Sequence, residues 1–160
     1  GYGQTAWSLR QDPRVVLRER TNLRHLTPED LYGPGDSQPD LAVADLSFIS
    51  LSRVLEPMQK LLAGGPQAEA VLLVKPQFEV GRERVGKGGV VRDPKAHADA
   101  IALVADAAKP LQWFPQGLVG SPITGAAGNH EYLLWLGPTA ELGSSAFSAL
   151  IEQVVQSTNA

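Results

Sequence analysis

The chain lacks several residue types and patterns, and each absence removes a class of function. None of its 160 residues is cysteine, which excludes disulfide bonds, thiolate nucleophiles and cysteine-ligated zinc. The three histidines are far apart in the sequence and lack the spacing of metal ligands, so no metal site is expected. No apolar run approaches the roughly 20 residues that span a bilayer, and no signal peptide is evident. We therefore expect a cytoplasmic protein that does not contact membranes.

The charge balance is mildly acidic, with 14 basic and 17 acidic residues and a net charge of −3. Domains that coat nucleic acid by bulk electrostatics are usually strongly basic. The balance therefore argues against such a domain. It is compatible with an enzyme whose positive charge is local, or whose affinity for nucleic acid comes from another domain. The length suits one compact domain.

Short apolar runs alternate with helix signals along the chain. Strands are expected at residues 14–18, 41–44, 70–74, 111–120 and 132–136. Helices are expected at residues 4–10, 51–62, 94–109 and 140–155, with a further helix start at Thr27-Pro28. This alternation predicts an α/β fold with a doubly wound sheet. Sheets of this kind bind ligands at the carboxyl ends of their strands.

Two charged residues come directly after predicted strands: Asp45 follows residues 41–44, and Lys75 follows residues 70–74. A lysine at the mouth of a buried strand needs water or carboxylate partners, because an unpaired buried ammonium is costly. Asp45 and Glu131 are the candidate partners. A lysine held between two acids can help to deprotonate a substrate hydroxyl. The alternative is an ordinary salt bridge that closes the sheet edge.

A glycine-rich loop follows Lys75. Residues 81–87 fit the first seven positions of a phosphate-binding loop, but Gly88 stands where that motif needs serine or threonine. A nucleoside triphosphatase is therefore disfavoured. The loop carries four basic residues that could contact RNA phosphates, and acidic neighbours that would equally suit a solvated surface loop. The basic residues are Arg82, Arg84, Lys87 and Arg92.

Taken together, six segments make the chain recognisable. They are Gly1–Gln4, Glu19–Asn22, Asp45–Leu51, Leu73–Glu79, Val85–Asp93 and Gly128–Tyr132. In this order and spacing they resemble the TlyA (hemolysin A-like) family of FtsJ-like RNA ribose 2′-O-methyltransferases, from Gly1 to about Leu136. Each segment alone is weak evidence, whereas the combination is highly specific.

The resemblance implies a Rossmann-like, S-adenosylmethionine-dependent methyltransferase fold. Its sheet would be mostly parallel, with an antiparallel C-terminal strand. The family's active site is a Lys-Asp-Lys-Glu tetrad, and Asp45, Lys75 and Glu131 match its last three members. By this resemblance Lys75 helps to deprotonate the ribose 2′-hydroxyl while Asp45 and Glu131 orient it. The implied substrate is a cytidine ribose of ribosomal RNA, either free or within a ribosomal subunit.

The chain also departs from the family pattern. The N-terminal S4 RNA-binding domain, the first tetrad lysine and the first cofactor-binding strand and loop have no counterpart here. Residues 1–160 are thus expected to form a partial, N-terminally truncated methyltransferase domain that is by itself weak or inactive. Its remaining contacts to S-adenosylmethionine are expected from Gly1, Tyr2, Asn22 and Asp45. A monomer is compatible with the sequence, which does not fix the oligomeric state.

Two other function classes are open at this stage. The family name implies a membrane-active hemolysin, but such a protein needs an amphipathic or alternating segment that faces lipid, and none is found. A non-catalytic RNA-binding module would keep the basic loop. It would not need Asp45, Lys75 and Glu131 to converge.

Overall fold

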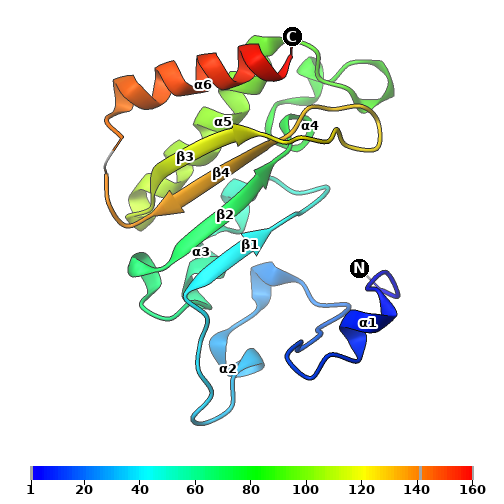
Figure 1. Ribbon diagram of the computed structural model, residues 1–160, viewed down its shortest axis with the longest axis vertical. Helices are drawn as coiled ribbons and strands as arrows, with labels where there is room; N and C mark the ends of the chain where they lie inside the picture. The colour runs from blue at the N-terminus through cyan, green and yellow to red at the C-terminus, as the bar shows by residue number, and fades with distance from the viewer. Residues whose placement is uncertain (1, 141, 160) are drawn as a thin grey trace.

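The computed structural model describes residues 2–140 and 142–159. Its centre is a four-stranded mixed sheet with the order β1-β2-β4-β3 (Figure 1). The strands are β1 (Leu41–Ala44), β2 (Glu69–Val74), β3 (Phe114–Gly120) and β4 (Tyr132–Gly137). β1 and β2 are parallel, whereas β4 is antiparallel to both β2 and β3. Three strands therefore run in one direction and the last runs against them, which confirms the predicted α/β class and antiparallel C-terminal strand.

The described residues form two long and four short α-helices beside the sheet. They are α1 (Trp7–Arg10), α2 (Pro28–Leu31), α3 (Leu55–Lys60), α4 (Pro76–Glu79), α5 (Pro94–Ala108) and α6 (Ser144–Thr158). The helix predicted at residues 51–62 is instead a 3-10 turn, Leu51–Arg53, followed by α3. Val54 separates them because its φ of −123° and ψ of −6° depart from helical values. No helix among the described residues is long and apolar enough to cross a membrane.

The core lies on one face of the sheet. Side chains alternate between the two faces of a strand, and one set is fully buried in β2 and β4, including Leu72 and Leu134. These side chains form a single cluster with residues of α3, α5 and α6, such as Leu55, Ile101 and Ile151. Each fully buried side chain of this size contributes about 1.5–3 kcal/mol of transfer free energy.

None of the described helices lies on the other face of the sheet (Figure 1). Leu41, Val43, Val119 and Trp135 on this face are 47%, 75%, 56% and 42% exposed. The described helices are therefore not on both faces, as a doubly wound sheet would have them. The reason is topological: β1, β2 and β3 follow one another in the same direction across the sheet. Right-handed crossovers then put α3 and α5 on the same side.

The prediction of a strand at residues 14–18 is wrong. Val15, Val16 and Leu17 are exposed and lie in an irregular segment. The N-terminal segment lies beyond the β1 edge of the sheet (Figure 1). In the described part of the chain this segment pairs with no strand, and an apolar run forms a strand only where a neighbour accepts its backbone hydrogen bonds.

Candidate active site

Asp45 and Lys75 meet at the carboxyl end of the parallel pair β1 and β2. The register pairs Ala44 with Leu72, so the residues that follow each strand emerge side by side. Lys75 Nζ lies 2.6 Å from Asp45 Oδ1 and donates a hydrogen bond of 3.3 Å to Ser47 Oγ. The Lys75 side chain is only 12% exposed, whereas that of Asp45 is 69% exposed. The amine is thus held inward by a carboxylate that stays open to solvent.

Glu131 lies just before β4, which is antiparallel to β2, and it therefore lies at the same edge of the sheet as Lys75. Its buried carboxylate accepts a hydrogen bond of 3.3 Å from Gln77 Nε2. Asp45, Lys75, Gln77 and Glu131 all line one cavity of about 610 Å³. The structure therefore brings the three predicted catalytic residues together, with Gln77 beside Glu131. Sequence reasoning missed Gln77, although Pro76 begins the turn of α4 that places it next to the strand end.

The glycine-rich loop forms another wall of this cavity and is tied to the Glu131 segment by Asn129. The buried Asn129 side chain accepts a 3.0 Å hydrogen bond from the Val91 N–H through Oδ1. Its Nδ2 donates to the Gly89 carbonyl at 2.9 Å. Gly88 and Gly89 both have φ of +78°, a region that favours glycine. No helix begins at Gly88, since α5 begins at Pro94, so the nucleoside triphosphatase alternative gains no support.

Residues 1–138 match the FtsJ-like methyltransferase family. The chain belongs to this family. It is 51% identical over 146 residues to the 16S/23S rRNA (cytidine-2′-O)-methyltransferase TlyA of Mycobacterium tuberculosis, covering 91% of this chain and 52% of the relative. It is 36% identical over 137 residues to hemolysin A of Brachyspira hyodysenteriae, covering 83% and 53%.

A solved structure of a hemolysin-like protein from Streptococcus thermophilus superposes with a TM-score of 0.85 at 36% identity. The superposition covers 99% of this chain and 55% of that protein. The chain thus spans about half the length of the curated relatives that it matches. These comparisons confirm the resemblance seen in the sequence and the Rossmann-like fold of FtsJ-like methyltransferases.

Of the residues expected to hold the cofactor, the structure places only some near the cavity. Gly1 lies outside the described residues. Tyr2 is exposed, and the Arg20 guanidinium stacks over its ring with Cζ 3.9 Å from the ring centroid. The Asn22 side chain accepts from the Arg24 N–H at 3.1 Å and begins the 3-10 turn Leu23–His25. Neither Tyr2 nor Asn22 lines the cavity that contains Asp45. The described residues therefore fit one side of a cofactor site rather than an enclosed one.

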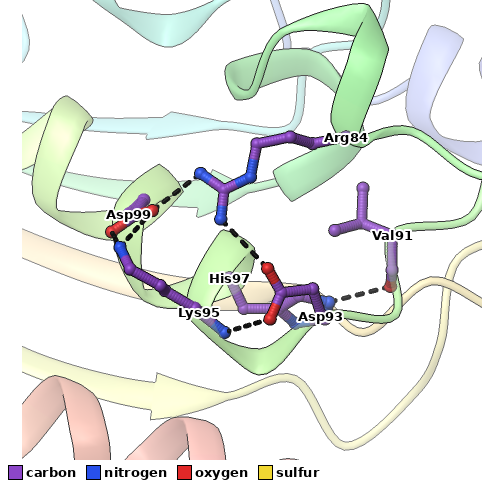
Figure 2. A network of polar contacts seen from close by, with 6 residues as sticks. All are labelled: Arg84, Val91, Asp93, Lys95, His97 and Asp99. Atoms are coloured by element: carbon purple, nitrogen blue, oxygen red, sulfur yellow. Dashed lines mark hydrogen bonds and ion pairs between the residues drawn. The ribbon is translucent and has the colours of Figure 1, made fainter.

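The four basic residues expected to contact RNA fall into two groups. Arg82, Lys87 and Arg92 are exposed. Arg84 instead forms two ion pairs: its Nη1 lies 2.7 Å from Asp99 Oδ2, and its Nη2 lies 3.2 Å from Asp93 Oδ2 (Figure 2). Asp93 caps the start of α5. These two carboxylates raise the pKa of Arg84. An RNA contact by Arg84 stays a prediction, and it would have to compete with both ion pairs.

His97 holds the far end of the glycine-rich loop. Its Nε2 donates to the Val91 carbonyl at 2.9 Å (Figure 2), and its Nδ1 accepts from the Tyr132 hydroxyl at 2.7 Å. The Tyr132 oxygen in turn accepts from Asn159 Nδ2 at 3.0 Å. Burial lowers the pKa of His97 from its ordinary value of 6.5, which favours a neutral ring. With the proton on Nε2 for the Val91 carbonyl, Nδ1 is then the acceptor. His97 therefore acts as a structural link and not as a solvent-facing base.

Acidification is expected to destabilise the fold through His97. Because its pKa is lower in the folded chain, the unfolded chain binds the proton first as the pH falls below about 6.5. The stability present above that pH is then lost progressively as the pH falls through the folded value. Urea midpoints between pH 7.5 and 5 check this. The His97→Gln variant should show a flatter profile, and identical profiles would contradict the assignment.

Gly125 leaves the space that Glu131 occupies. A Cβ at residue 125 would lie 2.6 Å from Glu131 Oε1. The Gly125→Ala variant is therefore expected to displace the carboxylate and to lower kcat about tenfold or more, because catalysis by positioning is sensitive to such shifts. Only the end of a flexible side chain has to move, so the melting temperature should change little.

Gly143→Ala is the matched control for this prediction, since a Cβ there meets nothing within 4 Å. Kinetics at saturating substrate measure the effect in the full-length protein. Equal kcat values for the two variants would show that the observed position of Glu131 is not needed.

Proposed function

We propose that the protein containing this chain transfers a methyl group from S-adenosylmethionine to the 2′-hydroxyl of a cytidine ribose in ribosomal RNA. One observation carries the proposal: Asp45, Lys75 and Glu131 line a single cavity at the carboxyl end of a parallel strand pair. A non-catalytic RNA-binding module has no need for that convergence. The substrate is inferred from relatives named as rRNA (cytidine-2′-O)-methyltransferases.

Lys75 is the proposed catalytic residue. Asp45 and Ser47 hold its amine at the cavity wall, where it can take part in removing the proton of the ribose 2′-hydroxyl. Glu131, held by Gln77, lines the same cavity and is proposed to orient the amine and the hydroxyl. The cofactor supplies the methyl group. Of the described residues proposed to hold the cofactor, Asp45 is the one that lines the cavity. Gly1, Tyr2 and Asn22 stay proposed cofactor contacts.

Phe48 offers a place for the target base. Its side chain is 90% exposed, its φ is +64°, and its ring centroid lies 5.2 Å from that of Phe78 at the cavity wall. An exposed aromatic ring in a strained backbone conformation is typical of a functional site. Aromatic side chains of this kind stack on the bases of single-stranded nucleic acid. Arg82, Lys87, Arg92 and, less directly, Arg84 are proposed to contact RNA phosphates.

The test is a methyl-transfer assay on the full-length protein with labelled S-adenosylmethionine. Naked ribosomal RNA and intact ribosomal subunits are offered separately, and the labelled RNA is digested to nucleosides. Label is expected in 2′-O-methylcytidine. Absence of label from every RNA, in a preparation shown to bind the cofactor, would overturn the proposal.

A further inference from the structure

A second hollow of about 590 Å³ adjoins the catalytic cavity. Phe48, Gln77 and Phe78 line both spaces, so the aromatic pair forms the wall between them. Three arginines, Arg24, Arg53 and Arg82, also line this second space. We call it the arginine hollow.

The three arginines come from separate parts of the chain. Arg24 lies in the 3-10 turn Leu23–His25, Arg53 ends the turn Leu51–Arg53, and Arg82 begins the turn Arg82–Arg84. All three are exposed. Among the described residues none has a carboxylate within ion-pairing distance, in contrast to Arg84 with its two. The fold therefore gathers three unneutralised cations around one space.

No acidic residue lines the arginine hollow. The nearby Glu79 is buried, and its carboxylate accepts from the Leu51 N–H at 2.9 Å and from Ser50 Oγ at 2.6 Å. Its hydrogen bonds hold Ser50 and Leu51, between Phe48 and Arg53 in the chain, and Glu79 does not line the arginine hollow. Like charges gathered in this way repel one another, and a bound anion would relieve that repulsion.

Guanidinium groups bind phosphate oxygens in a planar, two-bonded geometry. A ribose placed at Lys75 is joined to each neighbouring nucleotide through a phosphate on its 3′ or 5′ oxygen, and the arginine hollow lies across the Phe48–Phe78 wall from it. We propose that the arginine hollow binds the nucleotide adjacent to the methylated one, with its phosphate against Arg24, Arg53 and Arg82. This inference rests on the proposed function.

The test compares two triple variants of the full-length protein. Arg24→Gln, Arg53→Gln and Arg82→Gln together remove the cations of the hollow. Arg14→Gln, Lys60→Gln and Lys109→Gln together remove the same charge from exposed residues, each paired with a carboxylate outside the hollow. Dissociation constants for ribosomal RNA are measured over a range of salt concentrations, and kcat and KM are measured alongside. Matching melting temperatures establish that both triple variants fold.

The hollow variant is expected to bind RNA about tenfold or more weakly than the control variant at equal salt. The slope of its log affinity against log salt should be shallower by about 1, since the one lost phosphate contact contributes roughly 0.7–0.9. KM for RNA should rise by a larger factor than kcat at saturating RNA falls. Equal affinities and slopes for the two triple variants would overturn the inference.

Binding and turnover separate this inference from the proposed function. A wild-type protein that binds RNA without methylating it, and whose hollow variant loses affinity, would refute the methyltransferase proposal alone. A wild-type protein that methylates RNA, with a hollow variant that matches its control, would refute the arginine hollow alone. A wild-type protein with no affinity for RNA would overturn both.

Discussion

Replacing Lys75 with methionine is expected to lower the rate of methyl transfer about 1,000-fold. Methionine keeps an unbranched apolar stem in a side-chain position that is only 12% exposed, but it removes the amine that contacts Asp45 and Ser47. Positioned acid–base groups contribute roughly 10²–10⁴ in rate. Single-turnover kinetics of the full-length protein, at saturating RNA and cofactor, measure the chemical step directly.

The matched control for this prediction is Lys60→Met. Lys60 is exposed on α3 and pairs with Glu56 one helical turn away. Its replacement should leave the rate unchanged. The affinities of the Lys75 variant for cofactor and for RNA should stay within about threefold of wild type. The reason is that the proposed role of the amine is to deprotonate the ribose hydroxyl and not to bind RNA. A Lys75→Met rate within tenfold of wild type would reduce Lys75 to a salt bridge that closes the sheet edge.

The largest expected loss of stability comes from Trp113→Ala, at about 4 kcal/mol. Trp113 has no exposed surface, and its Nε1 donates a 2.8 Å hydrogen bond to the Ala68 carbonyl. Alanine would leave a large cavity in the single core and a buried carbonyl without its donor. The free energy of unfolding in urea, extrapolated to water, measures the loss.

Trp7→Ala is the control, because Trp7 is 71% exposed and its replacement should change the free energy of unfolding by less than about 0.5 kcal/mol. Trp113 would have to be reassigned as a peripheral side chain if its variant lost less than about 1 kcal/mol.

The catalytic candidates could be predicted from the sequence because their positions depend on strand ends. Asp45 and Lys75 each follow a short apolar run, and parallel neighbouring strands bring such residues together at one edge. Glu131 precedes a strand that runs the other way, so it reaches the same edge. The positions of these three residues at strand ends were enough to group them, and the family resemblance added the antiparallel direction of the last strand.

Other features could not be predicted, because they depend on loops that meet only in three dimensions. The contacts of Asn129 to Gly89 and Val91 join segments about 40 residues apart. Arg24, Arg53 and Arg82 share no local pattern that would reveal a common space. The apolar run at Val15–Leu17 failed as a strand for a related reason: hydrophobicity is local, whereas a strand also needs a neighbour.

The hydrogen bonds that begin at Asn159 bear on where this folded unit ends. The family match stops at residue 138, yet α6 buries Phe147, Ile151 and Val155 in the common core. From Asn159 at its end, contacts run through Tyr132 and His97 to Val91, close to the cavity that Lys75 and Gly89 line. A domain boundary drawn at the edge of sequence similarity would cut through this unit, so the last helix belongs with the methyltransferase fold in any design that trims or fuses it.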